Sequence, residues 1–441
     1  MAKKKVSTED NNDVLGGIAS VMAMVKAVDD SAEIIEDSVY SNISEWVPSG
    51  NYILNACMSG DLFKAIPAGR VTALCGASQS GKSFLACSIC REAQKLGYTP
   101  IYMDSEGAID ADFVKRLGVD PSKMIIKQVT TIFETSQFMA NVLKQLLAQQ
   151  EKTGKNDKVI FVLDSLGNLT SEKEREDTLS GSQKADFTKA KDAKALFRVN
   201  ATPLAKTQSM FVVCNHVYSN MSFIPSNVMS QGTGLTYNAS ITLELSAAKL
   251  DDKQNDKAAA EKKGSEAGTK TGVLVTAKPI KSRFCRPMKV KFQIPYYKAP
   301  NPYVGLEQFM NWENSGVVRG NVLSEKDYQK LSDNDKKKVF AFDFNGETRY
   351  AQSKDTARGI VVKHLGEAVP LTEFYTDRVF TPEFLEELNV NVIHPLFALP
   401  DQSSFEDIKD IEESLGLSEN DDAPAPIDSP SPAVDNPVTS I

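Results

Sequence analysis

The chain has 441 residues, of which 41% are hydrophobic and 24% are charged. This composition is ordinary for a globular protein and excludes a wholly disordered chain. No apolar run approaches the roughly 18 residues that a membrane span requires. No apolar stretch follows the basic start MAKKKVSTEDNND either, so we expect neither a membrane anchor nor a secretory signal. Six cysteines are spread thinly along the chain, which favours a reducing, cytoplasmic location.

The net charge of −8 is unevenly distributed. Residues 401–441 carry eleven acids and one base, whereas the other 400 residues carry 49 bases and 47 acids. A nearly neutral body with an acidic tail does not exclude a nucleic-acid partner. Because the tail is also rich in proline and serine and cannot bury a core, we expect it to be disordered.

The N-terminal residues 1–45 are polar at first and mildly amphipathic over 21–35, which predicts a short helical arm for oligomerisation. Short apolar runs then alternate with helical patterns. This alternation predicts an α/β core over 46–299 with a mostly parallel central sheet. The expected strands are 71–75, 101–103, 159–163 and 210–214, and the expected helices are 83–96 and a segment that begins at the Thr131/Glu134 capping-box spacing.

Two more strands are expected at 241–245 and 288–294, on either side of a charged, glycine- and alanine-rich loop or hairpin tip at 247–270. Residues 300–400 show a mixed pattern, which we interpret as a small C-terminal α+β domain. The expected order is therefore arm, core, small domain and acidic tail.

A phosphate-binding motif follows the first predicted core strand. The segment Gly76-Ala77-Ser78-Gln79-Ser80-Gly81-Lys82-Ser83 matches G-x-x-x-x-G-K-[ST] completely, with a helical pattern after it. Backbone N–H groups of such a loop point at phosphate oxygens, and the following helix adds positive potential. Lys82 is expected to reach the β- and γ-phosphates, and the Ser83 hydroxyl to ligate Mg²⁺. The motif therefore predicts a nucleotide site.

Polar residues follow three other predicted strands. Asp164 ends the apolar pentad 159–163 and is the expected second Mg²⁺ ligand. Glu106 and His216 follow the strands at 101–103 and 210–214, and the carboxyl ends of parallel strands meet at one edge, where ligands bind. Glu106 is thus a candidate to polarise the attacking water, and Asn215 or His216 a candidate to sense the γ-phosphate.

Kinases, GTPases, helicases and recombinases all remain open on these residues alone. The order of parts narrows the choice. Ser49-Gly-Asn-Tyr-Ile-Leu-Asn before the phosphate loop, Asp104-Ser-Glu106-Gly after the next strand, and Asp164-Ser-Leu-Gly-Asn168 resemble the RecA-type recombinase core. The stretches Ala195-Leu-Phe-Arg198, Asn215-His216 and Gly232-Thr-Gly234 look especially like the UvsX recombinases of tailed phages. The resemblance covers about residues 45–320.

The resemblance implies roles for individual residues. Glu106 would be the catalytic glutamate that activates water. Asp110 and Phe113 would lie near the adenine of ATP, with Phe113 stacked on the base. Lys281 and Arg283 fall where the family places two cations that reach the γ-phosphate of the neighbouring subunit. A cation supplied in trans would couple hydrolysis to filament packing.

The resemblance also places two DNA-binding loops, within 170–184 and at 217–231. The second loop, VYSNMSFIPSNVMSQ, has no charged residue, which departs from the family pattern. An apolar loop of this kind suits a wedge between bases. Phosphate contacts would then come from bases nearby, such as Lys184, Lys189, Lys191 or Arg198. The apolar candidates for DNA contact are Met221, Phe223, Ile224 and Met229.

Together these features imply a DNA-dependent ATPase that uses ATP and Mg²⁺. It would form helical filaments of this chain on single-stranded DNA and pair them with double-stranded DNA for strand exchange. That activity serves recombination, repair and recombination-dependent replication, in the host cytoplasm if a phage encodes the chain. The acidic tail would compete with DNA or recruit mediator and single-strand-binding proteins. The alternatives left open are a ring-forming helicase or motor, an ATP-gated scaffold without useful hydrolysis and, more distantly, a small-molecule kinase.

Overall fold

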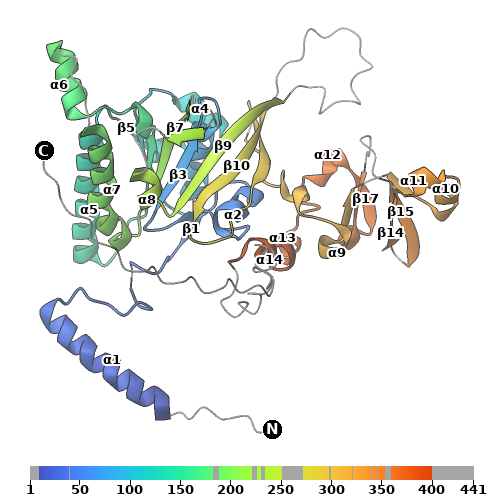
Figure 1. Ribbon diagram of the computed structural model, residues 1–441, viewed down its shortest axis with the longest axis horizontal. Coiled ribbons are helices and arrows are strands. Elements are labelled where there is room, and N and C mark those ends of the chain that lie inside the picture. The colour runs from blue at the N-terminus through green and yellow to red at the C-terminus, as the bar shows by residue number, and fades with distance from the viewer. Residues whose placement is uncertain are drawn as a thin grey trace, which may run out of the picture. The chain divides into compact units, whose positions relative to one another are not determined.

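The structure is a computed structural model that describes residues 9–38, 40–181, 188–220, 226–229, 234–250, 272–296, 299–319, 321–337, 339–344, 346–352 and 359–399. Within these ranges the chain folds around a central β-sheet that helices cover (Figure 1). The expectation of a disordered tail at 401–441 lies outside the described residues.

The strands of the central sheet follow the order β11-β10-β9-β3-β7-β6-β4-β5, and β8 pairs with β7. Strands β9, β3, β7, β6, β4 and β5 run parallel to one another. β10 and β11 are antiparallel additions beside β9, and β8 is antiparallel to β7. This confirms the predicted α/β fold with a mostly parallel sheet. The strands are β3 (Val71–Gly76), β4 (Thr99–Asp104), β5 (Ile125–Gln128), β6 (Val159–Asp164), β7 (Met210–Asn220), β8 (Ser226–Met229), β9 (Ile241–Leu250), β10 (Gly272–Ser282) and β11 (Val290–Pro295).

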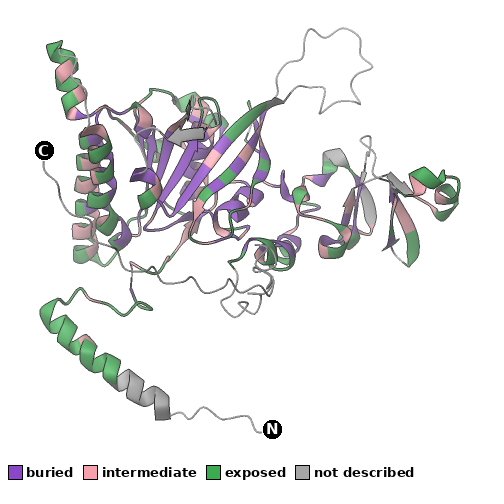
Figure 2. Cartoon of the chain, in the orientation of Figure 1, coloured by how far each residue is buried: buried purple, intermediate pink, exposed green. Residues whose placement is uncertain are grey.

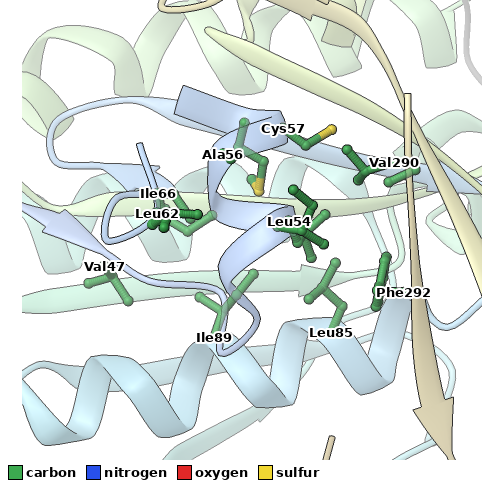
Figure 3. Close-up of a cluster of buried hydrophobic side chains, with 14 of the residues drawn as sticks. Val47, Leu54, Ala56, Cys57, Leu62, Ile66, Leu85, Ile89, Val290 and Phe292 are labelled. Carbon is green, nitrogen blue, oxygen red and sulfur yellow. The ribbon is translucent and has the colours of Figure 1, made fainter. Parts of the chain in front are cut away.

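Alternate residues of each core strand face opposite sides of the sheet and build two apolar clusters, as the two-residue period of a strand requires. One side contributes Leu74, Val162 and Cys214 to a cluster closed by α2 and α3, part of which Figure 3 shows. The other side contributes residues such as Phe161 to a cluster closed by α5 and α7. The central strands are therefore buried on both faces (Figure 2). The helices up to β9 are α1 (Glu9–Val28), α2 (Tyr52–Ser59), α3 (Lys82–Lys95), α4 (Ala111–Arg116), α5 (Ile132–Thr153), α6 (Glu172–Ser180), α7 (Thr188–Lys206) and α8 (Gly234–Asn238).

The start of α5 differs in one detail from the prediction. Thr131 caps α5 by accepting a hydrogen bond from the Glu134 N–H at 3.1 Å, as predicted. The Glu134 carboxylate, however, accepts from the N–H of Thr130, not of Thr131, so the capping box is not reciprocal. In the N-terminal segment 1–45, where a helical arm was expected, helix α1 spans Glu9–Val28. It ends where the Asp29 carboxylate accepts from the Ser31 N–H at 3.0 Å, a local turn that competes with the helix.

Strand β9 runs to Leu250, so its last residues belong to the sheet and not to the loop expected from 247. β9 and β10 pair in an antiparallel register from Gly272↔Leu250 to Ser282↔Ile241, around residues 251–271, which are outside the described ranges. Strand β5, which was not predicted, adds the edge next to β4.

The segment Ser49–Asn55 builds the start of α2. The Asn55 side-chain oxygen accepts from the Ser49 N–H at 2.8 Å and from its hydroxyl at 2.6 Å. Asn51 caps α2 and donates from its side chain to the Val304 carbonyl at 3.0 Å. The hydrogen bonds of Asn51 therefore connect the start of α2 to the segment around residue 304.

Residues after 300 form two small antiparallel sheets, β12-β16-β17 and β13-β15-β14. Their strands are β12 (Val317–Arg319), β13 (Asn321–Leu323), β14 (Val339–Phe344), β15 (Glu347–Gln352), β16 (Gly359–Val362) and β17 (Glu367–Pro370). The helices are α9 (Trp312–Ser315), α10 (Glu325–Gln329), α11 (Asp333–Lys336), α12 (Leu371–Phe374), α13 (Pro382–Leu388) and α14 (His394–Phe397), with a π-helical turn at Asn389–Ile393. Tyr303 stacks on Tyr52 of α2, with ring centroids 5.5 Å apart. Among the helices in the described ranges, none combines the length and the apolar character that crossing a membrane demands.

Candidate nucleotide site

The phosphate loop leaves the carboxyl end of β3 and leads into α3, as the motif predicts. Gly81 lies at the N-cap of α3 with φ 94° and makes no side-chain capping bond. The first N–H groups of α3 therefore lack a cap and are available to an anion. A Cβ at Gly76 would come within 2.5 Å of the Leu245 carbonyl oxygen, so the loop leaves no room for a side chain there. All eight motif residues line one cavity of about 750 Å³.

Lys82 lies at the base of this cavity with only 6% of its surface exposed. Its Nζ donates to the carbonyl oxygens of Gly76 at 3.0 Å and Ala77 at 2.8 Å. The loop backbone thus holds the ammonium group next to the place where phosphates would sit. The buried Ser80 hydroxyl, also in the cavity wall, has no hydrogen-bond partner among the described residues, so a phosphate oxygen would satisfy it.

Ser83 and Asp164 line the same cavity, on α3 and at the end of β6. A hydroxyl and a carboxylate oxygen suit Mg²⁺, which prefers oxygen ligands and keeps phosphate oxygens and waters for its remaining positions. Within the part of the chain that the structure describes, no three His, Cys, Asp or Glu side chains gather into a metal cluster. The Ser83 hydroxyl and the Asp164 carboxylate fit Mg²⁺ bound together with a nucleotide.

Asp164 is buried, with 2% of its surface exposed. The Tyr102 hydroxyl donates to its Oδ2 at 2.7 Å. Burial, followed by the charge of Asp164, raises the pKa of Tyr102 well above its ordinary value, so this hydroxyl stays protonated and donates. Tyr102 of the neighbouring strand β4 therefore holds the carboxylate of Asp164, the expected metal ligand, in place.

Glu106 reaches the cavity from the turn after β4. The buried Asp104 carboxylate builds this turn by accepting from the N–H groups of Glu106 at 2.9 Å and Gly107 at 2.8 Å. Oε1 of Glu106 accepts from the Ser165 hydroxyl at 2.6 Å and is 2.8 Å from His216 Nε2. Burial raises the pKa of the Glu106 carboxyl, but the hydrogen bonds from Ser165 and His216 and the charge of Lys82 outweigh burial and lower it. The group is therefore ionised near neutrality and able to accept a proton.

His216 connects this carboxylate to a hairpin. It lies on β7 in register with Gly76 of β3, which places it beside the phosphate loop. The same strand continues to Asn220 and pairs with β8, with Val217 opposite Met229. One strand thus contacts the candidate catalytic glutamate and enters the hairpin.

Phe113, the expected partner of the adenine, lines the cavity, whereas Asp110 does not. Asp110 is exposed and caps α4, where its carboxylate accepts from the Phe113 N–H at 2.7 Å. Tyr296, after β11, also lines the cavity and has 44% of its surface exposed. Two aromatic side chains from distant segments therefore line the same cavity, and each ring offers a face on which a planar base could stack.

Lys281 lies near the end of β10, and Arg283 directly follows that strand. Lys281 is in register with Thr242 of β9, which is in turn in register with Ala73 of β3. Ala73 lies three residues before Gly76, where the phosphate loop leaves β3. The Nζ of Lys281 donates to the Thr236 and Tyr237 carbonyl oxygens at 2.9 and 3.1 Å. Burial and then the charge of Arg283 lower the pKa of Lys281. Neither cation lines the nucleotide cavity of its own chain.

Most of the expected DNA contacts lie outside the described residues. Met221, Phe223, Ile224 and Lys184 lie outside the described residues, and Met229 is described only as the end of β8. The first predicted loop contains helix α6, which Ser171 caps. Lys189 of α7 lies 3.5 Å from the Glu174 carboxylate of α6.

Three site residues were missed by the sequence analysis. Ser165 directly follows Asp164, and its polar side chain at a strand end was the available signal. Tyr102 is a tyrosine in an otherwise apolar strand, and a buried tyrosine hydroxyl requires a partner. Tyr296 gave no signal, because its segment meets the phosphate loop only in the folded chain.

A phosphate loop, an uncapped helix start and a hydroxyl–carboxylate pair at the edge of a parallel sheet define a phosphate-loop nucleotide-binding protein. The family model for the RecA N-terminal domain matches residues 29–298, more than half of the chain. The chain therefore belongs to the RecA family.

Three relatives illustrate the range of this similarity. A "Recombination and repair protein" of Enterobacteria phage T4 is 30% identical over 203 residues, 45% of this chain and 50% of that protein. "Protein RecA" of Thermus aquaticus is 25% identical over 349 residues, 79% of this chain and 84% of that protein. "DNA repair protein recA homolog 3, mitochondrial" of Arabidopsis thaliana is 26% identical over 239 residues, 53% of this chain and 50% of that protein. The chain spans about half the length of the phage and plant relatives.

Proposed function

We propose that this chain is a DNA-dependent ATPase that forms helical filaments on single-stranded DNA and catalyses homologous pairing and strand exchange. It would serve recombination, repair and recombination-dependent replication. The observation that carries the proposal is the contact of Glu106 with His216, because it joins a candidate catalytic carboxylate to the strand that enters the β7–β8 hairpin.

Hydrolysis would begin with a water held by Glu106 against the γ-phosphate. The Ser165 hydroxyl and His216 Nε2 both contact Oε1, at 2.6 and 2.8 Å. Oε2 is thus the oxygen that would accept the proton of the water. Lys82 and the α3 N-terminus would neutralise the phosphates, and Mg²⁺ on Ser83 and Asp164 would offset charge that develops on them.

Lys281 and Arg283 are proposed to act on the nucleotide of the next copy in the filament. Both lie outside the nucleotide cavity of their own chain, and Arg283 is exposed. A cation from a second copy would add transition-state stabilisation only when the copies are packed. Turnover would therefore depend on assembly.

Two exposed apolar features support self-association. Among the strands that the structure describes, β5 pairs with β4 alone, and its Ile125 and Ile126 are 50% and 53% exposed. Helix α1 exposes Val21 and Val28 at 58% and 90%. An open strand edge with apolar side chains, and an apolar helix stripe, are surfaces that another chain can cover.

We propose that the β7–β8 hairpin and the apolar residues 217–231 bind DNA. Lys184 and its basic neighbours would contact the DNA phosphates. Bound ATP would order the hairpin through His216, and hydrolysis would release it. Because stacking and phosphate contacts ignore sequence, binding should be sequence-neutral and should fall with salt. The acidic residues 401–441 would compete with DNA or bind mediator and single-strand-binding proteins.

The proposal is tested by strand exchange between homologous DNAs with ATP, alongside electron microscopy of the same mixtures. We expect joint molecules, helical filaments and ATP turnover that single-stranded DNA stimulates. Closed rings that translocate on duplex DNA would favour a motor. Filaments without stimulated turnover would favour a scaffold.

A further inference from the structure

The buried carboxylate of Asp164 is held by a residue that no part of the phosphate motif includes. Tyr102 lies in the middle of β4, is fully buried, and donates its hydroxyl to Asp164 Oδ2 at 2.7 Å. β4 and β6 are parallel neighbours in which Tyr102 is level with Val162. The side chain therefore reaches along the sheet by two residues to the strand end where Asp164 enters the cavity.

The surroundings of this hydrogen bond contain few other donors. Asp164 is flanked by the buried thiols of Cys87 on α3 and Cys214 on β7. Burial, followed by the charge of Asp164, raises the pKa of Cys214 well above its ordinary value, and a protonated thiol is only a weak hydrogen-bond donor. Among the described residues, the Tyr102 hydroxyl is thus the stronger donor to this carboxylate.

We propose that Tyr102 is a positioning residue that fixes Oδ2 of Asp164 and so leaves Oδ1 as the oxygen presented to the divalent cation of the bound nucleotide. This inference rests on the nucleotide–magnesium site of the proposed function. Without the hydroxyl, the carboxylate loses its main orienting donor and can turn away from the cavity. Loss of such an outer-shell partner typically weakens metal affinity by about 10–100-fold.

The chain supplies a matched control. Tyr98, the residue before β4, is 4% exposed, and its hydroxyl donates to the Glu45 carboxylate at 2.6 Å. Both tyrosines thus give a buried phenol to a carboxylate, but only Tyr102 gives it to a residue of the cavity wall. Tyr98→Phe therefore removes a tyrosine–carboxylate hydrogen bond of the same kind but leaves the hydrogen bond to Asp164 intact.

The experiment titrates Mg²⁺ against the full chain and a fluorescent, slowly hydrolysed ATP analogue, for wild type, Tyr102→Phe and Tyr98→Phe. We expect Tyr102→Phe to raise the half-saturating Mg²⁺ concentration about tenfold or more. Nucleotide affinity in EDTA should stay unchanged, and Tyr98→Phe should titrate like wild type. In an Asp164→Asn background, Tyr102→Phe should cause no further shift.

Both phenylalanine variants keep the ring and its volume, and thermal melting checks that each is folded. The inference is overturned if wild type binds the analogue with Mg²⁺ dependence but Tyr102→Phe titrates identically. It is also overturned if Tyr98→Phe shifts the midpoint equally. A wild-type chain that binds no nucleotide at any Mg²⁺ concentration would overturn the proposed function as well.

Discussion

Replacing Glu106 by glutamine tests the separate roles of the two oxygens of its carboxylate. Ser165 and His216 both contact Oε1, so an amide oxygen in that position keeps both hydrogen bonds, while the NH₂ group replaces Oε2. The NH₂ group cannot accept a proton. We therefore expect Glu106→Gln to fold and bind ATP like wild type but to hydrolyse it slowly.

The size of the effect follows from the role assigned to Glu106. General-base catalysis typically contributes about 10²–10⁴-fold, which corresponds to a barrier increase of roughly 3–5 kcal/mol. Single-turnover hydrolysis with saturating single-stranded DNA measures this step directly, and binding of a fluorescent nucleotide measures the affinity. The control is Glu134→Gln, which changes a carboxylate that also accepts hydrogen bonds but lies outside the nucleotide cavity.

The stability of the same variant has a predictable pH dependence. The pKa of Glu106 is lowered in the folded chain, so its ionised form contributes stability above the ordinary glutamate pKa. That contribution is lost as the pH falls through the lowered value. The melting difference between wild type and Glu106→Gln should accordingly shrink on acidification. Hydrolysis by Glu106→Gln within about tenfold of wild type would refute the role of general base.

Three further predictions follow from the same geometry. Lys281→Ala and Arg283→Ala should each leave ATP binding by isolated chains unchanged but lower DNA-stimulated turnover by roughly 10³-fold. The measurement is ATP hydrolysis with and without single-stranded DNA. An equal loss of turnover without DNA would contradict action in trans. Gly76→Ala should abolish nucleotide binding, measured by fluorescence titration, because its Cβ would meet the Leu245 carbonyl oxygen at 2.5 Å; near-wild-type affinity would show that the loop can shift. Deleting residues 401–441 should tighten binding to single-stranded DNA at moderate salt, measured by fluorescence anisotropy, whereas an unchanged affinity would remove competition by the tail.

The parts of the site that the sequence predicts are those carried by contiguous residues. Gly76–Ser83 could be recognised because its loop, lysine and helix start follow one another along the chain. Asp164 and Glu106 were predicted because they lie at or just beyond the carboxyl ends of strands in a parallel sheet. The contacts of Tyr102 with Asp164 and of Ser165 with Glu106 join residues about 60 positions apart, and no local pattern encodes such pairs.

The fold shows the same division. The buried strands β3, β6 and β7 were predicted from their apolar runs, but the edge strand β5 was missed because IIKQ is short and largely exposed. The amphipathic pattern of 21–35 extends past the end of α1 at Val28, because it includes Ile34 and Ile35, which follow the turn at Asp29. Apolar periodicity thus marks which residues tend to be covered, whereas a side-chain hydrogen bond sets where the helix ends.

The central claim is that the nucleotide in the Gly76–Ser83 cavity controls the grip on DNA through His216. The most direct measurement is the affinity of the full chain for a single-stranded oligonucleotide with a slowly hydrolysed ATP analogue and with ADP. We expect much tighter binding with the analogue, and we expect His216→Ala to abolish that difference while nucleotide binding persists. Equal affinities in the two nucleotide states, or an undiminished difference in His216→Ala, would contradict the account.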